Sequence, residues 1–279
     1  MWLKAAWSKV PGGAILAAGT ILTLAAVWLV FLRYVRPQRE GDGLTLLHRA
    51  AEAGDLQRVR ALLSGGVAVD TPGRDGITPL DCAARAGQLE VAKLLVAHGA
   101  DVNAGNCLPW NPAEVMRPLS WAVGPGHLEV VKFLVEAGAE IDYSGPDGMA
   151  PLASAAMCGQ TDIVGYLLHH GANPNRKDSS GRTALYLADG ETVRLLVEGG
   201  ARVNIRDLKG WTPLHSQAHE NNSQGCQYLI EYGADVNAKD ERGRTPLDEA
   251  LEKAYWEPGS TVVIDLLRKH GGLRGAPRS

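Results

Sequence analysis

The cysteines and the paired histidines are the residues of this chain whose chemistry could serve a metal site or a nucleophile. The four cysteines stand at positions 82, 107, 158 and 226, so no two of them form the closely spaced pair of a zinc site or a dithiol centre. His169 and His170 are adjacent, but no further histidine or cysteine at ligand spacing completes a set around them. We therefore predict no metal site, and we interpret the cysteines as reduced side chains that fill small spaces.

Motifs for phosphate, dinucleotide or hydrolytic chemistry are missing as well. The sequence has no nucleotide-binding Gly-x-x-x-x-Gly-Lys loop, no strand-linked Gly-x-Gly-x-x-Gly, no His-Glu-x-x-His and no Gly-x-Ser-x-Gly. Aspartates recur at turn positions, where their carboxylates favour local backbone hydrogen bonds, and the other carboxylates are expected on solvated surface. We predict no catalytic residue, no cofactor and no small-molecule substrate.

A pattern with a period near 33 residues organises most of the chain. A start similar to Thr-Pro-Leu-His recurs with its second position at residues 46, 79, 118, 151, 184, 213 and 246. A second half of the form Leu-Leu-x-x-x-Gly-Ala-Asp-Val-Asn is complete at residues 94–103. In the period of its repeats and in the Thr-Pro-Leu-His pattern that starts them, the sequence resembles the ankyrin-repeat family over about four fifths of its length. The resemblance implies that His48 and His215, at the fourth position of the start, are structural residues that hydrogen-bond between repeats.

The same resemblance implies an all-α solenoid of about seven helix–turn–helix repeats with projecting turns. In the second repeat, Thr78 is a good cap for the first helix, and Pro79 falls at the first helical position, where its missing N–H costs nothing. Gly87 should end this helix, and residues 89–95 should carry the second helix up to Gly99. No single repeat can bury both faces of its helix pair, so stacking must supply one continuous core.

Three repeats depart from the period. Six extra residues fall within 104–117, and we expect a loop there because insertions in solenoids map to loops, often on the binding face. The fifth repeat is four residues short, about one helical turn, and should distort the stack locally. The seventh repeat carries five extra residues around 255–259, which we also expect to form a loop.

The family resemblance further implies that the projecting turns and first helices line a concave groove that contacts partner proteins. The middle of this groove is apolar and its ends are charged, which is how interfaces with central anchors and a polar rim are built. In the alternative interpretation, Trp121 and Met157 pack against each other or beneath the long loop. The predicted partner-binding residues are Trp110, Trp121, Pro125, Met157, Cys158 and Leu187.

Residues 10–32 are 23 consecutive positions without a charge, which is long enough to cross a bilayer as one helix. Trp7, Trp28 and Tyr34 lie near the ends of this segment, where amphipathic rings prefer the membrane interface. We predict a retained N-terminal transmembrane helix. A cleaved signal peptide is the main alternative, although no small-residue cleavage site follows Leu32, and a buried helix is the other.

The charges beside this segment predict its orientation. Three arginines follow it and two lysines precede it, which favours repeats on the cytoplasmic side of a single-pass membrane protein; the alternative places them in a periplasm or lumen. The expected organisation is an anchor at 1–36, a linker at 37–43, an ankyrin repeat domain at 44–272 and a tail at 273–279.

The charge balance argues against nucleic-acid binding. Residues 41–279 hold 23 basic and 30 acidic residues with no basic stripe, whereas nucleic-acid affinity depends on neutralising phosphates. We predict a non-catalytic scaffold or regulator that is tethered to a membrane and binds another protein. One alternative is an exported protein, periplasmic, secreted or host-directed, whose first segment is a targeting signal. Another is a subunit of a membrane assembly whose span packs against other spans.

Overall fold

The computed structural model describes residues 44–73, 76–108, 111–143, 145–256 and 261–275. The helices within these residues belong to one compact unit, Gly43–Ser279. The predicted membrane span at residues 10–32 and the predicted binding residue Trp110 both lie outside the described residues. None of the described helices is both long and apolar enough to cross a lipid bilayer.

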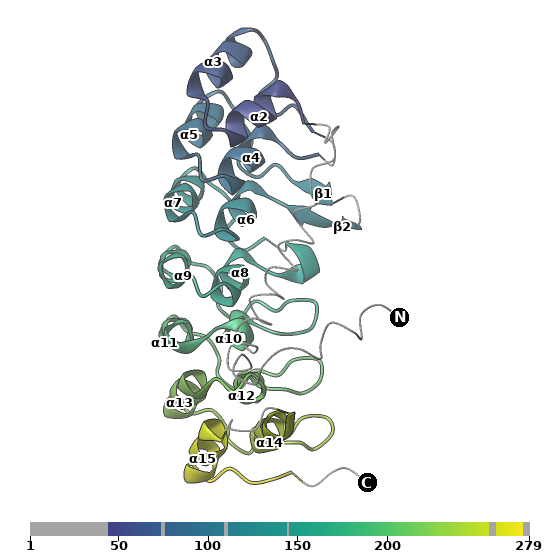
Figure 1. The fold of residues 1–279 in the computed structure, drawn as a ribbon, viewed down its shortest axis with the longest axis vertical. Coiled ribbons are helices and arrows are strands. Elements are labelled where there is room, and N and C mark those ends of the chain that lie inside the picture. Colours follow the sequence, from purple (N-terminus) through teal and green to yellow (C-terminus); the bar gives the residue numbers. More distant parts are fainter. Residues whose placement is uncertain (1–43, 74–75, 109–110, 144, 257–260, 276–279) are drawn as a thin grey trace, which may run out of the picture. The chain divides into compact units, whose positions relative to one another are not determined.

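Seven helix pairs follow one another along the described chain and stack in chain order (Figure 1). The first helices of the pairs are α2 (Leu46–Glu52), α4 (Pro79–Arg85), α6 (Pro118–Val123), α8 (Pro151–Met157), α10 (Ala184–Leu187), α12 (Pro213–His219) and α14 (Pro246–Trp256). The second helices are α3 (Leu56–Ser64), α5 (Leu89–Ala97), α7 (Leu128–Glu136), α9 (Thr161–His169), α11 (Gly190–Glu198), α13 (Ser223–Glu231) and α15 (Val262–Lys269).

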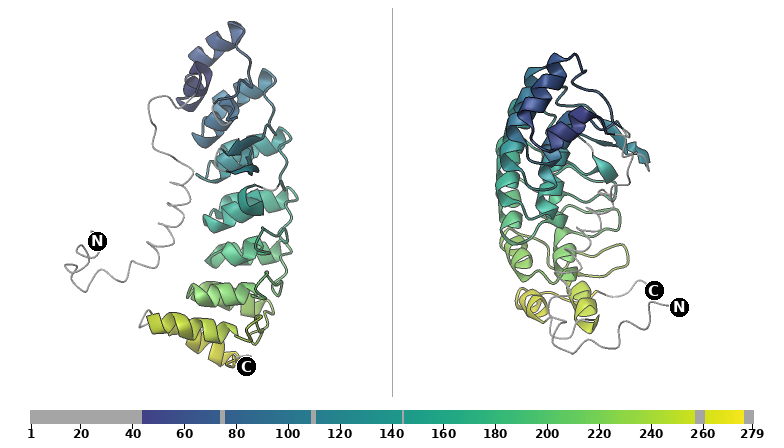
Figure 2. Two further views of the ribbon diagram at one scale, coloured as in Figure 1. Left: turned by 90° about the vertical axis from the view of Figure 1, so that its right-hand side faces the viewer. Right: turned by 45° about the horizontal axis from the view of Figure 1, so that its top comes forward.

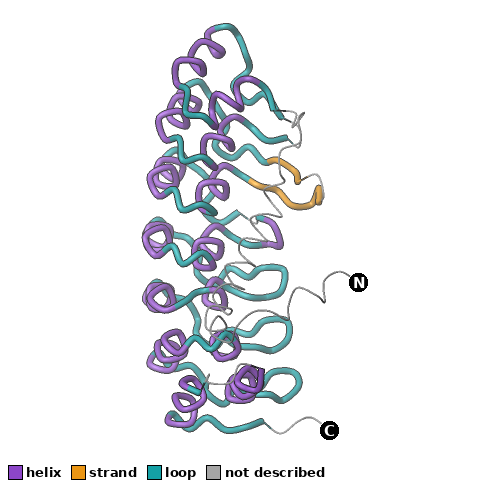
Figure 3. Tube along the Cα trace, viewed as in Figure 1, coloured by secondary structure: helices purple, strands orange, loops and turns teal. Residues whose placement is uncertain are grey.

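The two kinds of helix form two rows, which are visible in Figure 1 and in the right-hand view of Figure 2. First helices pack on the next first helix, as α2 does on α4, and second helices pack on the next second helix, as α5 does on α7. The segments that join one pair to the next project beside the row of first helices (Figure 3); we call these segments the fingers. The predicted helical solenoid is therefore present in the described residues.

The Thr-Pro start forms the helix start that the sequence predicts. The backbone N–H of Asp81 donates to Thr78 Oγ1 at 3.2 Å, and the backbone N–H of Thr78 donates to Asp81 Oδ2 at 2.8 Å. Pro79 is the first residue of α4. The reciprocal bonds occupy two backbone donors near the helix start that would otherwise have no partner there.

His48 and His215 stand at the position of Asp81 in their own repeats and connect to the next repeat. His215 Nδ1 accepts the backbone N–H of Thr212 at 3.1 Å, and its Nε2 lies 3.2 Å from the carbonyl oxygen of Arg244. His48 Nε2 lies 2.7 Å from the carbonyl oxygen of a residue in the second repeat. Burial lowers the pKa of His215, which favours the neutral ring with its proton on Nε2. The predicted structural role of both histidines is confirmed.

Asparagine side chains join successive fingers. Asn204 Nδ2 donates to the carbonyl oxygen of Gly233 at 3.0 Å, while Asn204 Oδ1 accepts the backbone N–H of Asp235 at 2.8 Å. Between the third and fourth repeats the position is held by Asp142, whose carboxylate accepts the backbone N–H of Asn173 at 3.1 Å but has no N–H to donate. The asparagines that make both bonds are Asn103, Asn175, Asn204 and Asn237.

The insertion between the second and third repeats is a β-hairpin and not an irregular loop. Strand β1 (Asn106–Leu108) pairs in antiparallel register with β2 (Asn111–Met116), with Cys107 opposite Val115. The prediction of an all-α chain is wrong at this place. The extra residues lengthen both halves of one finger. Two extended segments that lie side by side can form backbone hydrogen bonds with each other, which gives their N–H and C=O groups partners.

The other two departures differ in their outcome. In the fifth repeat, α10 keeps a single turn and its end is extended at Ala188, yet it still packs on α8 and α12, so the predicted local distortion is confirmed. In the seventh repeat, the expected loop is wrong for Tyr255 and Trp256, because α14 continues through both and reaches 11 residues.

Candidate protein-binding surface

Five of the six predicted binding residues lie on three consecutive first helices or directly after them. Trp121 is on α6, Met157 is the last residue of α8, and Leu187 is the last residue of α10. Cys158 follows α8 directly, and Pro125 lies just beyond α6. Because α8 packs on both α6 and α10, the structure brings these residues together on neighbouring repeats. We call the face formed by the row of first helices the first-helix face.

These five residues differ in what they offer to a partner. Pro125 is exposed, whereas Met157, Cys158 and Leu187 are half-buried. Trp121 is only 7% exposed, so most of its ring contacts the repeats themselves and a small edge is left for a partner. The burial of Trp121 agrees with the alternative in which the ring packs within the array.

Toward the N-terminal repeats, the first-helix face becomes charged. The guanidinium carbon of Arg85 lies 5.6 Å from the ring centre of Trp121, a cation–π distance. On its other side Arg85 forms an ion pair with Glu52 at 2.8 Å. This row of three side chains crosses the first three repeats and provides a polar border to the apolar residues on α8 and α10.

A second charged cluster lies on the sixth and seventh repeats, and the sequence analysis missed it. Glu249 is only 1% exposed, although the sequence led us to expect carboxylates on solvated surface. Its Oε1 lies 2.9 Å from the guanidinium of Arg244, and its Oε2 lies 3.3 Å from His219 Nδ1. These contacts are electrostatic, because neither Glu249 Oε1 nor His219 Nδ1 makes a well-aligned hydrogen bond within the described residues.

Trp211 completes this second cluster. Its ring centre lies 5.5 Å from that of His219 and 5.9 Å from the guanidinium carbon of Arg244. Arg244 also bonds Asp240, a second buried carboxylate, through Nε at 3.1 Å. The residues that form the cluster are up to about 40 positions apart in sequence, so only the stacking of repeats brings them together.

Comparison with known proteins agrees with this repeat geometry. The family model for ankyrin repeats, which holds three copies per match, fits residues 20–106, 111–178 and 184–272. The chain belongs to the ankyrin-repeat family. Ankyrin repeats indicate a protein that binds other proteins, as a scaffold or a regulator.

Several characterised ankyrin proteins are similar to parts of this chain. Protein phosphatase 1 regulatory subunit 12A of Mus musculus is 43% identical over 56 residues, which cover 19% of this chain and 5% of that protein. RelA-associated inhibitor of Mus musculus is 35% identical over 79 residues, which cover 27% of this chain and 10% of that protein. The similarity therefore spans only a small part of these relatives' length.

A solved ankyrin structure matches over most of the chain. The crystal structure of the human ASB11 ankyrin repeat domain superposes with a TM-score of 0.70 and 28% sequence identity. The match covers 84% of this chain and the whole of that domain. It supports the helical solenoid described above.

The chemistry of two cysteines on the array is suppressed by burial. Cys158 and Cys226 are free thiols. Burial raises the pKa of Cys226 to about 12 and also raises the pKa of Cys158, so both remain protonated and poorly nucleophilic at neutral pH. Within the described ranges, no three histidine, cysteine or acidic side chains converge in a way that could hold a metal ion.

The His219–Glu249 contact predicts a raised histidine pKa that NMR can measure. The Glu249 carboxylate raises the pKa of His219 above its ordinary value of about 6.5, more than partial burial lowers it. The contribution of this pair to the stability of the array is therefore fully present below pH ~6.5, and it is lost as the pH rises through the folded-state pKa of His219. In a histidine titration by NMR, the wild-type midpoint of His219 should lie above ~6.5, and Glu249→Gln should lower it. A midpoint that Glu249→Gln leaves unchanged would show that the carboxylate is not the cause.

Proposed function

We propose that this protein is a non-catalytic scaffold or regulator that binds a partner protein through the first-helix face of repeats three to five. One observation carries the proposal: Pro125, Met157 and Leu187 form an accessible apolar strip between two charged clusters, one around Arg85 and one around Glu249. Interfaces concentrate their binding energy in such an apolar centre with a polar rim. The relatives named protein phosphatase 1 regulatory subunit 12A and RelA-associated inhibitor support a regulatory role.

The test begins with a proximity-labelling screen that identifies the partner, followed by affinity measurements on variants. Met157→Glu and Leu187→Glu should each weaken binding by more than about 1 kcal/mol, because each places a charge in the apolar centre. Leu94→Glu is the matched control, since Leu94 is also a half-buried leucine but lies on α5, in the other row of helices. If Leu94→Glu weakens binding as much as Met157→Glu and Leu187→Glu do, the partner does not bind at the first-helix face.

Trp121 and Trp110 belong to the same proposal. Trp121→Ala and Trp110→Ala should each weaken partner binding by more than about 1 kcal/mol. Because Trp121 is 7% exposed, its removal also leaves a cavity, so a urea melt of each variant must accompany the binding measurement. Normal binding together with a lower urea midpoint would assign Trp121 to the core and not to the interface.

We further propose that residues 10–32 anchor the protein in a membrane, with the repeats on the cytoplasmic side. The support is the run of 23 uncharged residues and the arginines that follow it. The full chain should remain in membranes after a carbonate wash, and a chain that begins at Arg39 should be soluble.

The orientation has its own test. A reporter fused after Ser279 should be active on the cytoplasmic side. The ankyrin match begins at residue 20, inside the proposed span; release of the full chain by carbonate would assign residues 20–43 to the repeat array instead.

A further inference from the structure

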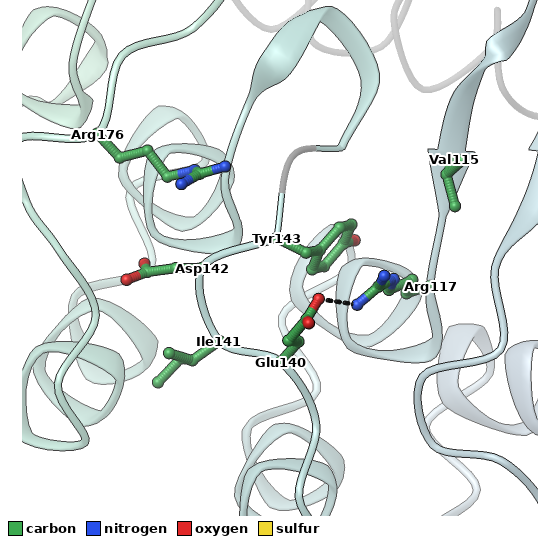
Figure 4. Close-up of a pocket in the computed structure, with 7 residues that line it drawn as sticks. All are labelled: Val115, Arg117, Glu140, Ile141, Asp142, Tyr143 and Arg176. Carbon is green, nitrogen blue, oxygen red and sulfur yellow. Dashed lines mark hydrogen bonds and ion pairs between the residues drawn. The ribbon is translucent and has the colours of Figure 1, made fainter.

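An open cleft of about 620 Å³ lies beside the hairpin, on the finger side of the third and fourth repeats (Figure 4). Val115 on β2 and Arg117 at the start of α6 form one wall. The finger that follows α7 forms the floor with Tyr143, and Arg176 of the next finger enters from the side opposite Arg117. The residues that line the cleft are Val115, Arg117, Glu140, Ile141, Asp142, Tyr143 and Arg176.

Arg117 is held in a fixed place but uses only part of its hydrogen-bonding capacity. Its guanidinium carbon lies 5.0 Å from the ring centre of Tyr143, and one terminal nitrogen pairs with the Glu140 carboxylate. Its Nε is buried and makes no hydrogen bond within the described residues. Because the buried Nε lies out of a ligand's reach, an incoming carboxylate would pair with the terminal nitrogens, which can donate two parallel N–H groups.

Glu140 shows which ligand chemistry this site accepts, because it already places a carboxylate on Arg117. The Glu140 side chain is 62% exposed, and ion pairs at exposed positions contribute little to stability. A carboxylate presented by another molecule can therefore displace Glu140 at small cost. The chain's own carboxylate then swings into solvent.

The cleft is lined by two arginines and two carboxylates, so with Glu140 displaced the lining keeps two guanidinium groups and one carboxylate. Burial raises the pKa of Tyr143, so its phenol stays neutral. Both oxygens of Asp142 face the backbone N–H of Asn173, each at 3.1 Å, which partly compensates that charge. Arg176 adds a second guanidinium to the lining. Val115 and Ile141 supply apolar walls, which suit a side chain carried on a peptide.

We infer that this cleft binds an acidic side chain, flanked by apolar residues, from a segment of a partner protein. Arg117 pairs with the incoming carboxylate in place of Glu140. The site goes beyond the function proposed above, since it lies on the fingers and not on the first-helix face. The hairpin makes it specific to this point of the array, because β2 supplies the Val115 wall.

The experiment measures fluorescence anisotropy of a labelled, capped peptide Ala-Leu-Glu-Leu-Ala with the full chain in detergent micelles, against the same peptide with Gln in place of Glu. The Glu peptide should bind at least tenfold more tightly. Arg117→Gln should lower its affinity about tenfold, which is the effect expected for one charge-assisted pair. Arg117→Lys keeps the charge without the fork and should lose an intermediate amount. Glu140→Gln should raise the affinity about threefold, since the competing carboxylate is removed.

Two surface variants make the matched controls. Glu129→Gln on α7 removes an exposed carboxylate and Arg194→Gln on α11 removes an exposed guanidinium, both away from the cleft. Neither should change the affinity. Equal effects of Glu140→Gln and Glu129→Gln, or equal affinity for the Glu and Gln peptides, would overturn the inference. A phosphoserine peptide that binds far more tightly than the Glu peptide, or competition by millimolar inorganic phosphate, would overturn the assignment to a carboxylate.

Discussion

Leu134→Ala should lower the free energy of unfolding by roughly 2–5 kcal/mol, the range for truncating a buried leucine. Leu134 is completely buried on α7, and α7 packs on α5 at one side and on α9 at the other. The substitution therefore opens a cavity at a place where two interfaces between repeats meet. Urea denaturation followed by circular dichroism measures the change.

The matched control for this substitution is at the end of the array. Leu267 is also completely buried, but it lies on α15, which has α13 as its neighbour in the row of second helices and no described helix beyond it. In a solenoid, stability is close to a sum over repeats and their interfaces, so Leu267→Ala should cost less than Leu134→Ala. Equal costs at the two positions would contradict the nearest-neighbour description of this array.

Arg244→Leu should also destabilise the array strongly, by roughly 3–5 kcal/mol, because it leaves buried carboxylates without their cation. The Arg244 guanidinium contacts Asp240 at 3.1 Å and Glu249 at 2.9 Å, and these carboxylate side chains are 2% and 1% exposed. Removal of one partner from a buried ion pair costs more than the pair itself contributes, since the remaining charge stays desolvated.

Arg182→Leu is the control, because Arg182 holds the equivalent place in the fifth repeat but contacts one buried carboxylate, Asp178, at 2.8 Å. It should cost less than Arg244→Leu.

A pH series tests whether the lost ion pairs are the cause of the destabilisation by Arg244→Leu. Burial alone would raise the pKa of Asp240, but hydrogen bonds from the Arg244 backbone and guanidinium lower it below its usual value. Such a group stabilises the fold above its unfolded-state pKa of ~3.9 and loses that contribution as the pH falls through its folded-state pKa. The deficit of Arg244→Leu should therefore shrink below pH ~4, and a deficit that stays constant would point to lost packing instead.

Local signals allowed much of the array to be predicted. Thr78 and Pro79 start a helix because the cap and the proline act within four residues, and they do so in any repeat with this pattern. The bridging role of His48 and His215 was implied by the family resemblance at their place in the repeat, and in the structure each of them meets a carbonyl of the next repeat. For the binding surface, the family resemblance pointed to residues of the first helices, and Trp121, Met157 and Leu187 lie on three adjacent first helices, with Pro125 and Cys158 just beyond them.

Other features depend on contacts that no local pattern reports. The insertion forms a hairpin because its two arms happen to pair, and the same count of extra residues could have formed a loop. In the seventh repeat, Tyr255 and Trp256 lengthen α14, where a loop was expected. Trp121 and Glu249 are buried by contacts with side chains of neighbouring repeats, which the sequence pattern does not report, so the analysis expected Trp121 to be accessible and Glu249 to be solvated.

The sequence by itself determined the family, the number and order of the helix pairs and the residues that begin the first helices. It could do so because a repeat of about 33 residues carries its own caps, turns and apolar spacing, and these act over short distances. Only the tertiary structure decided which charged side chains are buried together and which fingers enclose a cleft. The Arg117–Glu140 site and the Arg244–Glu249 cluster each join residues from different helices or repeats, and their geometry comes from how the repeats stack and not from any one segment.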